Sequence, residues 1–174
     1  MLATKRPNTR TISACVEIES VMKKLVTIYH YEEMTAATDK LIQAKSSPAV
    51  VIDGVQKCVG ILTRQNIQRY FQLWIRFLEN DESVLPEIFE TNAFGMLHID
   101  REFFHQVGKH MTSPVLTIER TKTVAAAEEI FEREPGVDHL VVVNEDQKPI
   151  GVLTRKDLPF PSDEMIDTST PCLA

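Results

Sequence analysis

One octapeptide occurs twice in the chain with little change. Residues 60–67 read GILTRQNI and residues 151–158 read GVLTRKDL, so the second glycine lies 91 positions after the first (151 minus 60). Self-similarity over such a distance is typical of duplicated supersecondary units that bury a core only by packing together. With 174 residues in total, the chain has room for two copies at this spacing and not for a third. We therefore predict a fold of two similar halves.

The repeat extends upstream of the octapeptide. Residues 49–53 align with residues 140–144, and both are apolar runs that end in a polar turn former. Further upstream, Met22 aligns with Met111 and the pair at 27–28 aligns with the pair at 117–118. Loop insertions explain why the offset drifts by one or two positions. The duplication thus covers nearly a whole unit.

Hydrophobic periodicity gives each copy the same order of elements: strand, helix, two strands and the start of a helix. In the first copy we predict strands at 25–28, 49–52 and 58–62, helices at 35–45 and 65–78, and a hairpin turn at Asp53-Gly54. In the second we predict strands at 115–118, 139–143 and 150–153, a helix at 124–133, and a turn at 144–146. Pro159 and Pro161 disfavour a closing helix in the second copy. The expected fold class is α+β of the α/β type.

The doubled Gly-aliphatic-aliphatic-Thr-x-x-Asp/Asn motif on β-α-β-β-α units resembles a tandem pair of cystathionine β-synthase (CBS) domains, a Bateman module. The resemblance implies two units packed sheet to sheet about a pseudo-two-fold axis. It also implies a regulatory, energy-sensing module without chemistry or a required cofactor, which binds AMP, ADP, ATP or S-adenosylmethionine between the domains. We assign an N-terminal extension (1–12), CBS domain 1 (13–78), an acidic and helical insert (79–108), CBS domain 2 (109–158) and a flexible tail (159–174).

The second motif can also be interpreted from its chemistry. A threonine that ends a strand and begins a helix lies among backbone N–H groups without intrahelical partners, which suits a phosphate. A neighbouring arginine, Arg155, adds positive charge, and Asp157 lies one turn on, where a carboxylate can accept ribose hydroxyls. The resemblance assigns phosphate and ribose contacts to Thr154 and Asp157. It assigns the base contacts to Thr117, Ile118, Val141, Val142 and Val143.

The first copy has Asn66 where the motif has aspartate, so we expect a weaker or empty site there. Asparagine can accept from a hydroxyl but lacks the negative charge of a carboxylate. The residues of this weaker site are Thr27, Ile28, Val51, Thr63, Arg64 and Asn66. In the second copy, Thr154 and Asp157 can also serve only to cap a helix. A ligand-free scaffold for protein interaction is therefore the alternative function.

The helix predicted at 65–78 has a wide apolar face with the only tryptophan, Trp74. Part of this face can cover the unit's own core, and its aromatic density also suits a homodimer or a protein partner. Between the copies, residues 79–90 carry five acidic and no basic side chains, which predicts a solvated loop. Residues 92–108 are more apolar and predict a packed helix or lid.

Composition excludes several classes of function. The net charge of −6 argues against a nucleic-acid binder, although residues 1–78 carry +5 (11 minus 6) and residues 79–174 carry −11 (8 minus 19). Three distant cysteines indicate neither a disulfide framework nor a zinc site, and His98, His105 and His110 lack metal-ligand spacing. With no catalytic motif, we do not predict an enzyme. No membrane span or secretory signal is predicted, so we expect a cytoplasmic protein.

Overall fold

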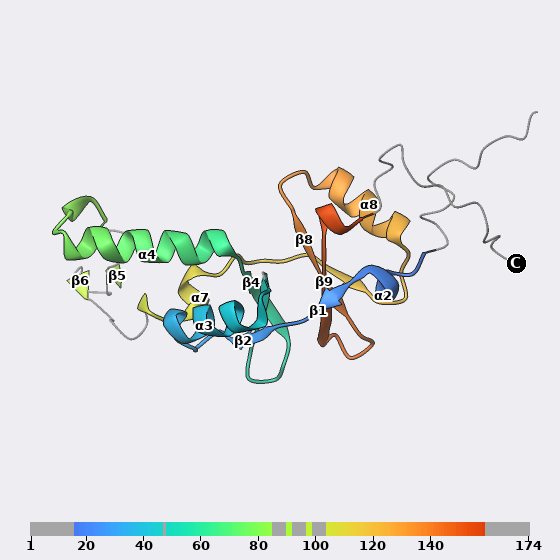
Figure 1. The fold of residues 1–174 in the computed structure, drawn as a ribbon, viewed down its shortest axis with the longest axis horizontal. Coiled ribbons are helices and arrows are strands. Elements are labelled where there is room, and N and C mark those ends of the chain that lie inside the picture. Colours follow the sequence, from blue (N-terminus) through green and yellow to red (C-terminus); the bar gives the residue numbers. More distant parts are fainter. Residues whose placement is uncertain (1–15, 47, 85–89, 92–96, 99–103, 159–174) are drawn as a thin grey trace, which may run out of the picture. The chain divides into compact units, whose positions relative to one another are not determined.

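A computed structural model describes residues 16–46, 48–84, 90–91, 97–98 and 104–158 (Figure 1). The chain divides into two compact units. The first-copy unit runs from Leu25 to Val115, and the second-copy unit joins the N-terminal segment up to Lys24 with the chain from Leu116 onward. Each unit has its own core and is described by itself.

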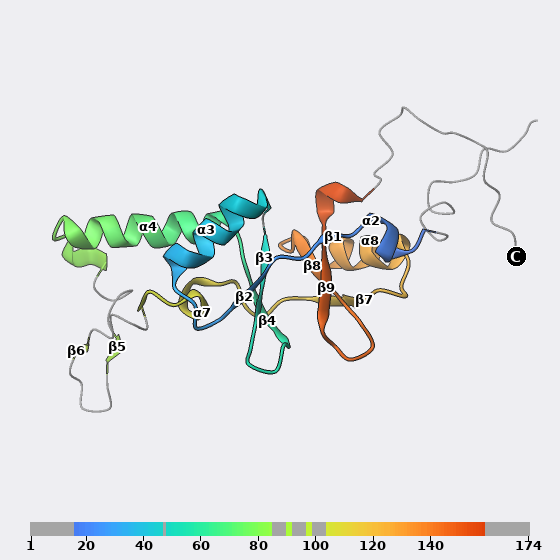
Figure 2. The same ribbon diagram turned by 60° about the horizontal axis from the view of Figure 1, so that its bottom comes forward.

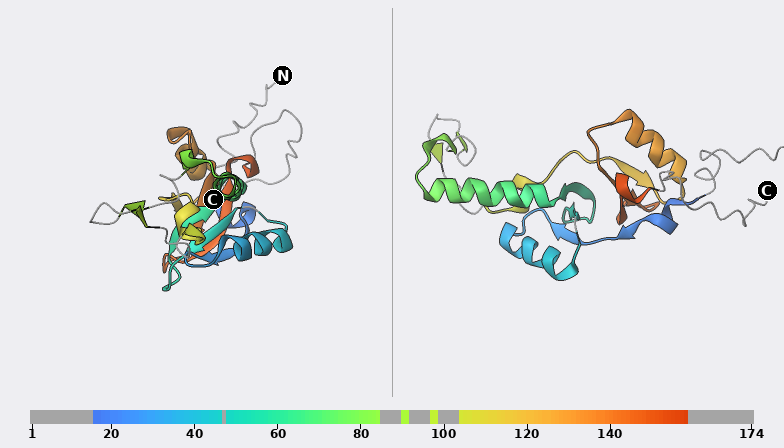
Figure 3. Two further views of the ribbon diagram at one scale, coloured as in Figure 1. Left: turned by 90° about the vertical axis from the view of Figure 1, so that its left-hand side faces the viewer. Right: turned by 45° about the horizontal axis from the view of Figure 1, so that its top comes forward.

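The first-copy unit is a three-stranded sheet covered by helices. Its strands are β2 (Thr27–Tyr29), β3 (Ala49–Ile52) and β4 (Cys58–Leu62), in the order β2-β3-β4. Strands β2 and β3 are parallel and are connected through α3 (Met34–Ala44), whereas β3 and β4 form an antiparallel hairpin. Helix α4 (Arg64–Leu78) follows β4 and extends beyond the three strands of this sheet (Figure 3).

The second-copy unit repeats this pattern with one added strand. Its sheet has the order β1-β9-β8-β7, with α8 (Val124–Arg133) connecting the parallel strands β7 and β8. The strands are β1 (Lys23–Lys24), β7 (Thr117–Glu119), β8 (His139–Val143) and β9 (Pro149–Thr154). Figure 2 shows the β8–β9 hairpin in orange to red and the corresponding β3–β4 hairpin in teal. The closing helix is only a 3₁₀ turn, η2 (Arg155–Asp157), as the prolines predict.

The mixed α+β fold and its order of elements are confirmed, and both hairpins have the same loop. In each loop, the first residue is hydrogen-bonded to the last through both its backbone and its side chain. A glutamine in each loop has a positive φ, which is 65° for Gln56 and 61° for Gln147. The prediction that Asp53-Gly54 forms the turn is therefore wrong in detail. Asp53 organises the loop with its carboxylate, but Gln56 rather than Gly54 takes the left-handed conformation.

The two copies exchange short segments, a feature that the sequence did not predict. Residues 16–24 of the first copy, including α2 (Ile18–Val21) and β1, belong to the second-copy unit. In the same way, α7 (Val107–His110) of the second copy belongs to the first-copy unit, where Thr112 forms a bridge with Ile61 of β4. Each unit is thus completed by a short segment that belongs in sequence to the other copy, where it precedes strand β2 or β7.

The glycine that begins each octapeptide makes room for this exchanged segment. A Cβ on Gly151 would lie 2.5 Å from Met22 Sδ and 3.2 Å from the carbonyl oxygen of Lys23. A Cβ on Gly60 would lie 2.9 Å from Met111 Cγ and 3.0 Å from the carbonyl oxygen of Thr112. The octapeptide repeat therefore encodes a close backbone approach on β4 and β9, in addition to its Thr-x-x-Asp/Asn element.

The end of the insert supplies part of the first-copy core. Phe104 and Val107 are buried among residues of α3, α4 and the sheet. His105 Nδ1 lies 2.7 Å from the Tyr70 hydroxyl, and its ring packs edge-on against Trp74 at 4.7 Å between centroids. Burial lowers the pKa of the neighbouring His110, whose Nε2 lies 2.6 Å from the carbonyl oxygen of Phe104. These rings account for the aromatic density of α4.

The predicted packed helix or lid at 92–108 is only partly within the described residues. Its described parts are strand β6 (Leu97–His98), paired with β5 (Glu90–Thr91), and residues 104–108, which pack in the core. The described part of the insert thus contains a short antiparallel ladder and the start of α7, and the helical character of the rest of the insert stays a prediction. Residues 92–96 and 99–103 lie outside the described part, as does the tail from 159.

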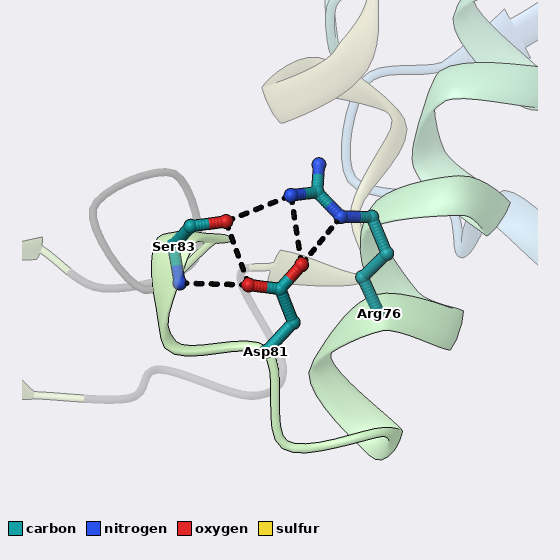
Figure 4. Close-up of polar contacts among 3 residues, drawn as sticks. All are labelled: Arg76, Asp81 and Ser83. Carbon is teal, nitrogen blue, oxygen red and sulfur yellow. Dashed lines mark hydrogen bonds and ion pairs between the residues drawn. The ribbon is translucent and has the colours of Figure 1, made fainter.

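The end of α4 is fixed by hydrogen bonds in the acidic stretch that follows it. Asn80 has φ 62° and the Asp81 N–H bonds the Arg76 carbonyl oxygen at 3.0 Å, as in a Schellman motif. Figure 4 shows the Asp81 carboxylate between Arg76 and Ser83, with Arg76 Nε at 2.8 Å and Ser83 Oγ at 2.7 Å. Hydrogen bonds from Ser83, and then Arg76, lower the pKa of Asp81. The acidic stretch thus begins as an ordered turn.

Candidate ligand site on the second-copy sheet

Strand register places two of the predicted site residues in one row across the second-copy sheet. Thr117 on β7 pairs with Val141 on β8, which pairs with Val152 on β9, which pairs with Lys23 on β1. Directly paired residues point to the same face of a sheet. Thr154 follows Val152 by two residues on β9 and so points to the same face. The row of paired residues therefore lies next to the Thr-x-x-Asp motif at the end of β9.

The predicted residues divide between the two faces of the sheet. Ile118 and Val142 point the other way and pack in the core with α8. Val141 and Val143 alternate with them and lie, with Thr117 and Thr154, on the face opposite α8. The structure therefore brings together Thr117, Val141, Val143 and Thr154 on one face, and it places Ile118 and Val142 beneath them.

At the end of β9, Asp157 accepts hydrogen bonds from two side chains. Its Oδ2 accepts from the Thr154 hydroxyl at 2.5 Å, and its Oδ1 lies 2.6 Å from Lys23 Nζ. We call Lys23, Thr154 and Asp157 the Asp157 cluster. Burial acts to raise the pKa of Asp157, but the bonds from Lys23 and Thr154 outweigh it, so the pKa is below its usual value. The carboxylate is therefore a charged acceptor at neutral pH.

His139 lies beside this cluster because it is paired with Thr154 across β8 and β9. The histidine is half-buried, and this burial lowers its pKa even though Asp138 and Asp157 act in the opposite direction. A neutral imidazole can donate through one ring nitrogen and accept through the other. Neither His139 nor Lys23 is indicated by the motif. Strand register was needed to find them, although the alignment of Met22 with Met111 pointed to the segment that carries Lys23.

Arg155 does not face the cluster, in contrast to the prediction that it accompanies a phosphate. Its Nη2 donates to the carbonyl oxygens of Phe131 at 2.7 Å and Val137 at 3.0 Å. The guanidinium also lies 5.0 Å from the centre of the Phe131 ring. Cationic side chains commonly bind the free carbonyls at a helix C-terminus, and here Arg155 closes the end of α8.

We expect Arg155→Gln to lower the free energy of unfolding of the second-copy unit by about 1.5 kcal/mol, because charged hydrogen bonds to otherwise free carbonyls are lost. Urea denaturation followed by circular dichroism measures this. Lys156→Gln, which changes an exposed neighbour of the same charge, is the control. Equal stability of the two variants would contradict the capping role.

The first-copy motif forms the equivalent cluster with neutral groups. Asn66 Oδ1 accepts from the Thr63 N–H at 2.8 Å and from its hydroxyl at 2.6 Å, and Asn66 Nδ2 donates to Thr112 Oγ1 at 3.2 Å. Thr63 and Asn66 together form a capping box on α4. In the first copy the motif thus caps a helix, whereas the Thr154 side chain does not cap η2. We call Thr63, Asn66 and Thr112 the Asn66 cluster.

The other first-copy residues follow the same division between faces. Ile28 and Val51 pack in the core, whereas Thr27 pairs with Val50 on the opposite face. Arg64 is exposed and lines a hollow together with residues of α3, and the lining of this hollow does not include the Asn66 cluster. Within the described part of the chain, no three His, Cys, Asp or Glu side chains gather to hold a metal ion.

Comparison with known proteins agrees with this architecture. The family model for the CBS domain matches residues 107–158. A crystal structure of CBSX2 in complex with AMP superimposes with a TM-score of 0.58 at 19% identity, covering 82% of this chain and 93% of that chain. The chain has the fold of a tandem CBS domain pair.

Two further CBS structures are similar to this pair. The CBS domain of a CBS-domain-containing membrane protein from Sphaerobacter thermophilus has a TM-score of 0.61 at 22% identity, covering 86% of this chain and 89% of its own. The CBS domain pair of protein MJ0100, in complex with 5′-methylthioadenosine and S-adenosyl-L-methionine, has a TM-score of 0.57 at 16% identity, covering 82% and 92%. No curated protein matches the chain by sequence. None of the helices that the structure describes is long and apolar enough to cross a membrane.

Proposed function

We propose that this CBS pair is a non-catalytic regulatory module that binds an adenosine-containing nucleotide at the Asp157 cluster. AMP, ADP, ATP and S-adenosylmethionine are the candidates, and occupancy would be transmitted to a partner protein or through a homodimer. The observation that carries the proposal is the ionised Asp157 carboxylate, held by Thr154 at the end of β9. CBSX2 and MJ0100, which have this fold, were crystallised with adenosine compounds.

The roles follow from the positions of the residues on one sheet face. Asp157 would accept the ribose hydroxyls, with Thr154 as a neighbouring hydroxyl for a phosphate or the sugar. The exposed Thr117 would contact the base, and the buried Val141 and Val143 would lie behind it on the same sheet face. Ile118 and Val142 would support the base from within the core, and Arg155 would stabilise the unit without contacting the ligand.

A thermal-shift titration with the candidate nucleotides tests the proposal, because a ligand that binds only the folded state raises the melting temperature. We expect Asp157→Asn to weaken binding about tenfold or more through loss of a charged acceptor. Asp146→Asn, an exposed aspartate in the β8–β9 loop, is the matched control and should bind like the parent. No shift from any candidate at millimolar concentration would refute nucleotide binding.

The second candidate function is a ligand-free scaffold for protein interaction. The Asn66 cluster favours it for the first copy, since the Asn66 side-chain oxygen already accepts two hydrogen bonds from Thr63. In α4, Ile75 and Leu78 remain 52% and 62% exposed and could contact a partner or a second copy. Sedimentation that shows a complex unaffected by nucleotide would favour this function over the first.

A further inference from the structure

Protein donors hold both oxygens of the Asp157 carboxylate. The Thr154 hydroxyl donates to Oδ2, and Lys23 Nζ lies 2.6 Å from Oδ1. A pair of ligand hydroxyls that binds both oxygens therefore competes with these two donors. Thr154 is fixed at the end of β9 by the chain itself. Lys23 is the donor that can leave, because its side chain is 62% exposed and flexible.

The Asn66 cluster serves as an internal comparison. There the residue from the exchanged segment is Thr112, and its contact with Asn66 is a neutral hydrogen bond. At the Asp157 cluster the corresponding contact is an ion pair with Lys23. Displacing Thr112 leaves no charge behind, whereas displacing Lys23 leaves an ammonium group without its counterion. The two clusters thus differ in what a ligand must bring.

We propose that Lys23 is a specificity-determining residue of the Asp157 cluster, which selects ligands that carry a phosphate over neutral nucleosides. This inference rests on the proposed nucleotide site. When ribose hydroxyls bind Asp157, Lys23 moves away from the carboxylate and a phosphate on the same ligand replaces its counterion. A neutral nucleoside breaks the ion pair and supplies no replacement, so it binds more weakly.

The experiment compares the dissociation constants of AMP and adenosine by calorimetry on the full chain. The preference for AMP is the dissociation constant of adenosine divided by that of AMP. We expect this ratio to be about three- to tenfold higher for the parent protein than for Lys23→Gln, the range that partly exposed charge pairs support. Lys23→Arg keeps the charge and should keep the preference. Lys24→Gln removes the same charge from the next residue of β1 and should also keep the preference for AMP. Lys24 pairs with Gly151 and so points to the opposite face of the sheet.

Salt provides a readout that a purely structural role of Lys23 would not change. The AMP preference of the parent should fall as ionic strength rises, and that of Lys23→Gln should fall less. An unchanged preference in Lys23→Gln, or an equal loss in Lys24→Gln, would overturn this inference and leave the proposed function standing. Failure of the parent to bind either ligand would also overturn this inference, whereas the proposed function falls only if none of the candidate nucleotides gives a thermal shift.

Discussion

Replacing Phe104 by alanine is expected to destabilise the first-copy unit by about 3–5 kcal/mol, the cost of removing a buried aromatic side chain and leaving a cavity. Phe104 is 2% exposed, and its ring lies 5.8 Å from that of Tyr70 and 5.0 Å from that of His110. Because Phe104 belongs to the insert between the copies, the result measures how much the insert contributes to the unit's core.

Urea denaturation followed by tryptophan fluorescence suits this test. Trp74 is the only tryptophan of the chain, and its ring lies 5.9 Å from that of Phe104. Leu78→Ala is the control, since Leu78 is 62% exposed on the same helix and its truncation should cost less than about 0.5 kcal/mol. A loss from Phe104→Ala as small as that of the control would show that the insert is dispensable for stability.

The sequence predicts the helices and strands of this fold well because the hydrophobic pattern of each element occurs twice, once in each copy. The helix at Val124–Arg133 and the strands at Ala49–Ile52, Cys58–Leu62 and His139–Val143 have the predicted bounds. Their apolar periodicity is a local property, and burial in each unit agrees with it. The short strand β1 could not be predicted in this way, because two lysines have no strand pattern and only pairing with β9 makes them a strand.

The candidate site was predicted less completely than the fold. Thr154 and Asp157 are brought together as the motif predicts. The position of Arg155 in the sequence, directly after Thr154, suggests a phosphate contact, but its side chain instead binds the carbonyls at the end of α8. Its orientation depends on where the end of α8 lies, which no spacing within the motif reveals. Lys23 lies far from Asp157 in sequence, and only the exchange of segments brings them together. Local chemistry thus predicted the acceptor and missed its partner.

The exchange itself gives the second large effect, which we expect from Gly151→Val. A branched side chain on Gly151 would collide with Met22 Sδ, 2.5 Å from the Cβ position, and with the Lys23 carbonyl oxygen at 3.2 Å. The methionine can turn aside, but the backbone oxygen moves only if β1 separates from β9. Overpacking of this kind costs about 3 kcal/mol at the upper end of its usual range.

Hydrogen exchange locates the effect of Gly151→Val, because backbone amides that pair β1 with β9 should lose protection first. Gly54→Ala is the matched control in the other hairpin, where nothing lies within 4 Å of the added carbon. If protection in β1 and overall stability both match those of the control, the close approach of the exchanged segment is not what the glycine serves. If β1 is released, Lys23 leaves Asp157 with it, so the same variant should also reduce the preference for AMP over adenosine.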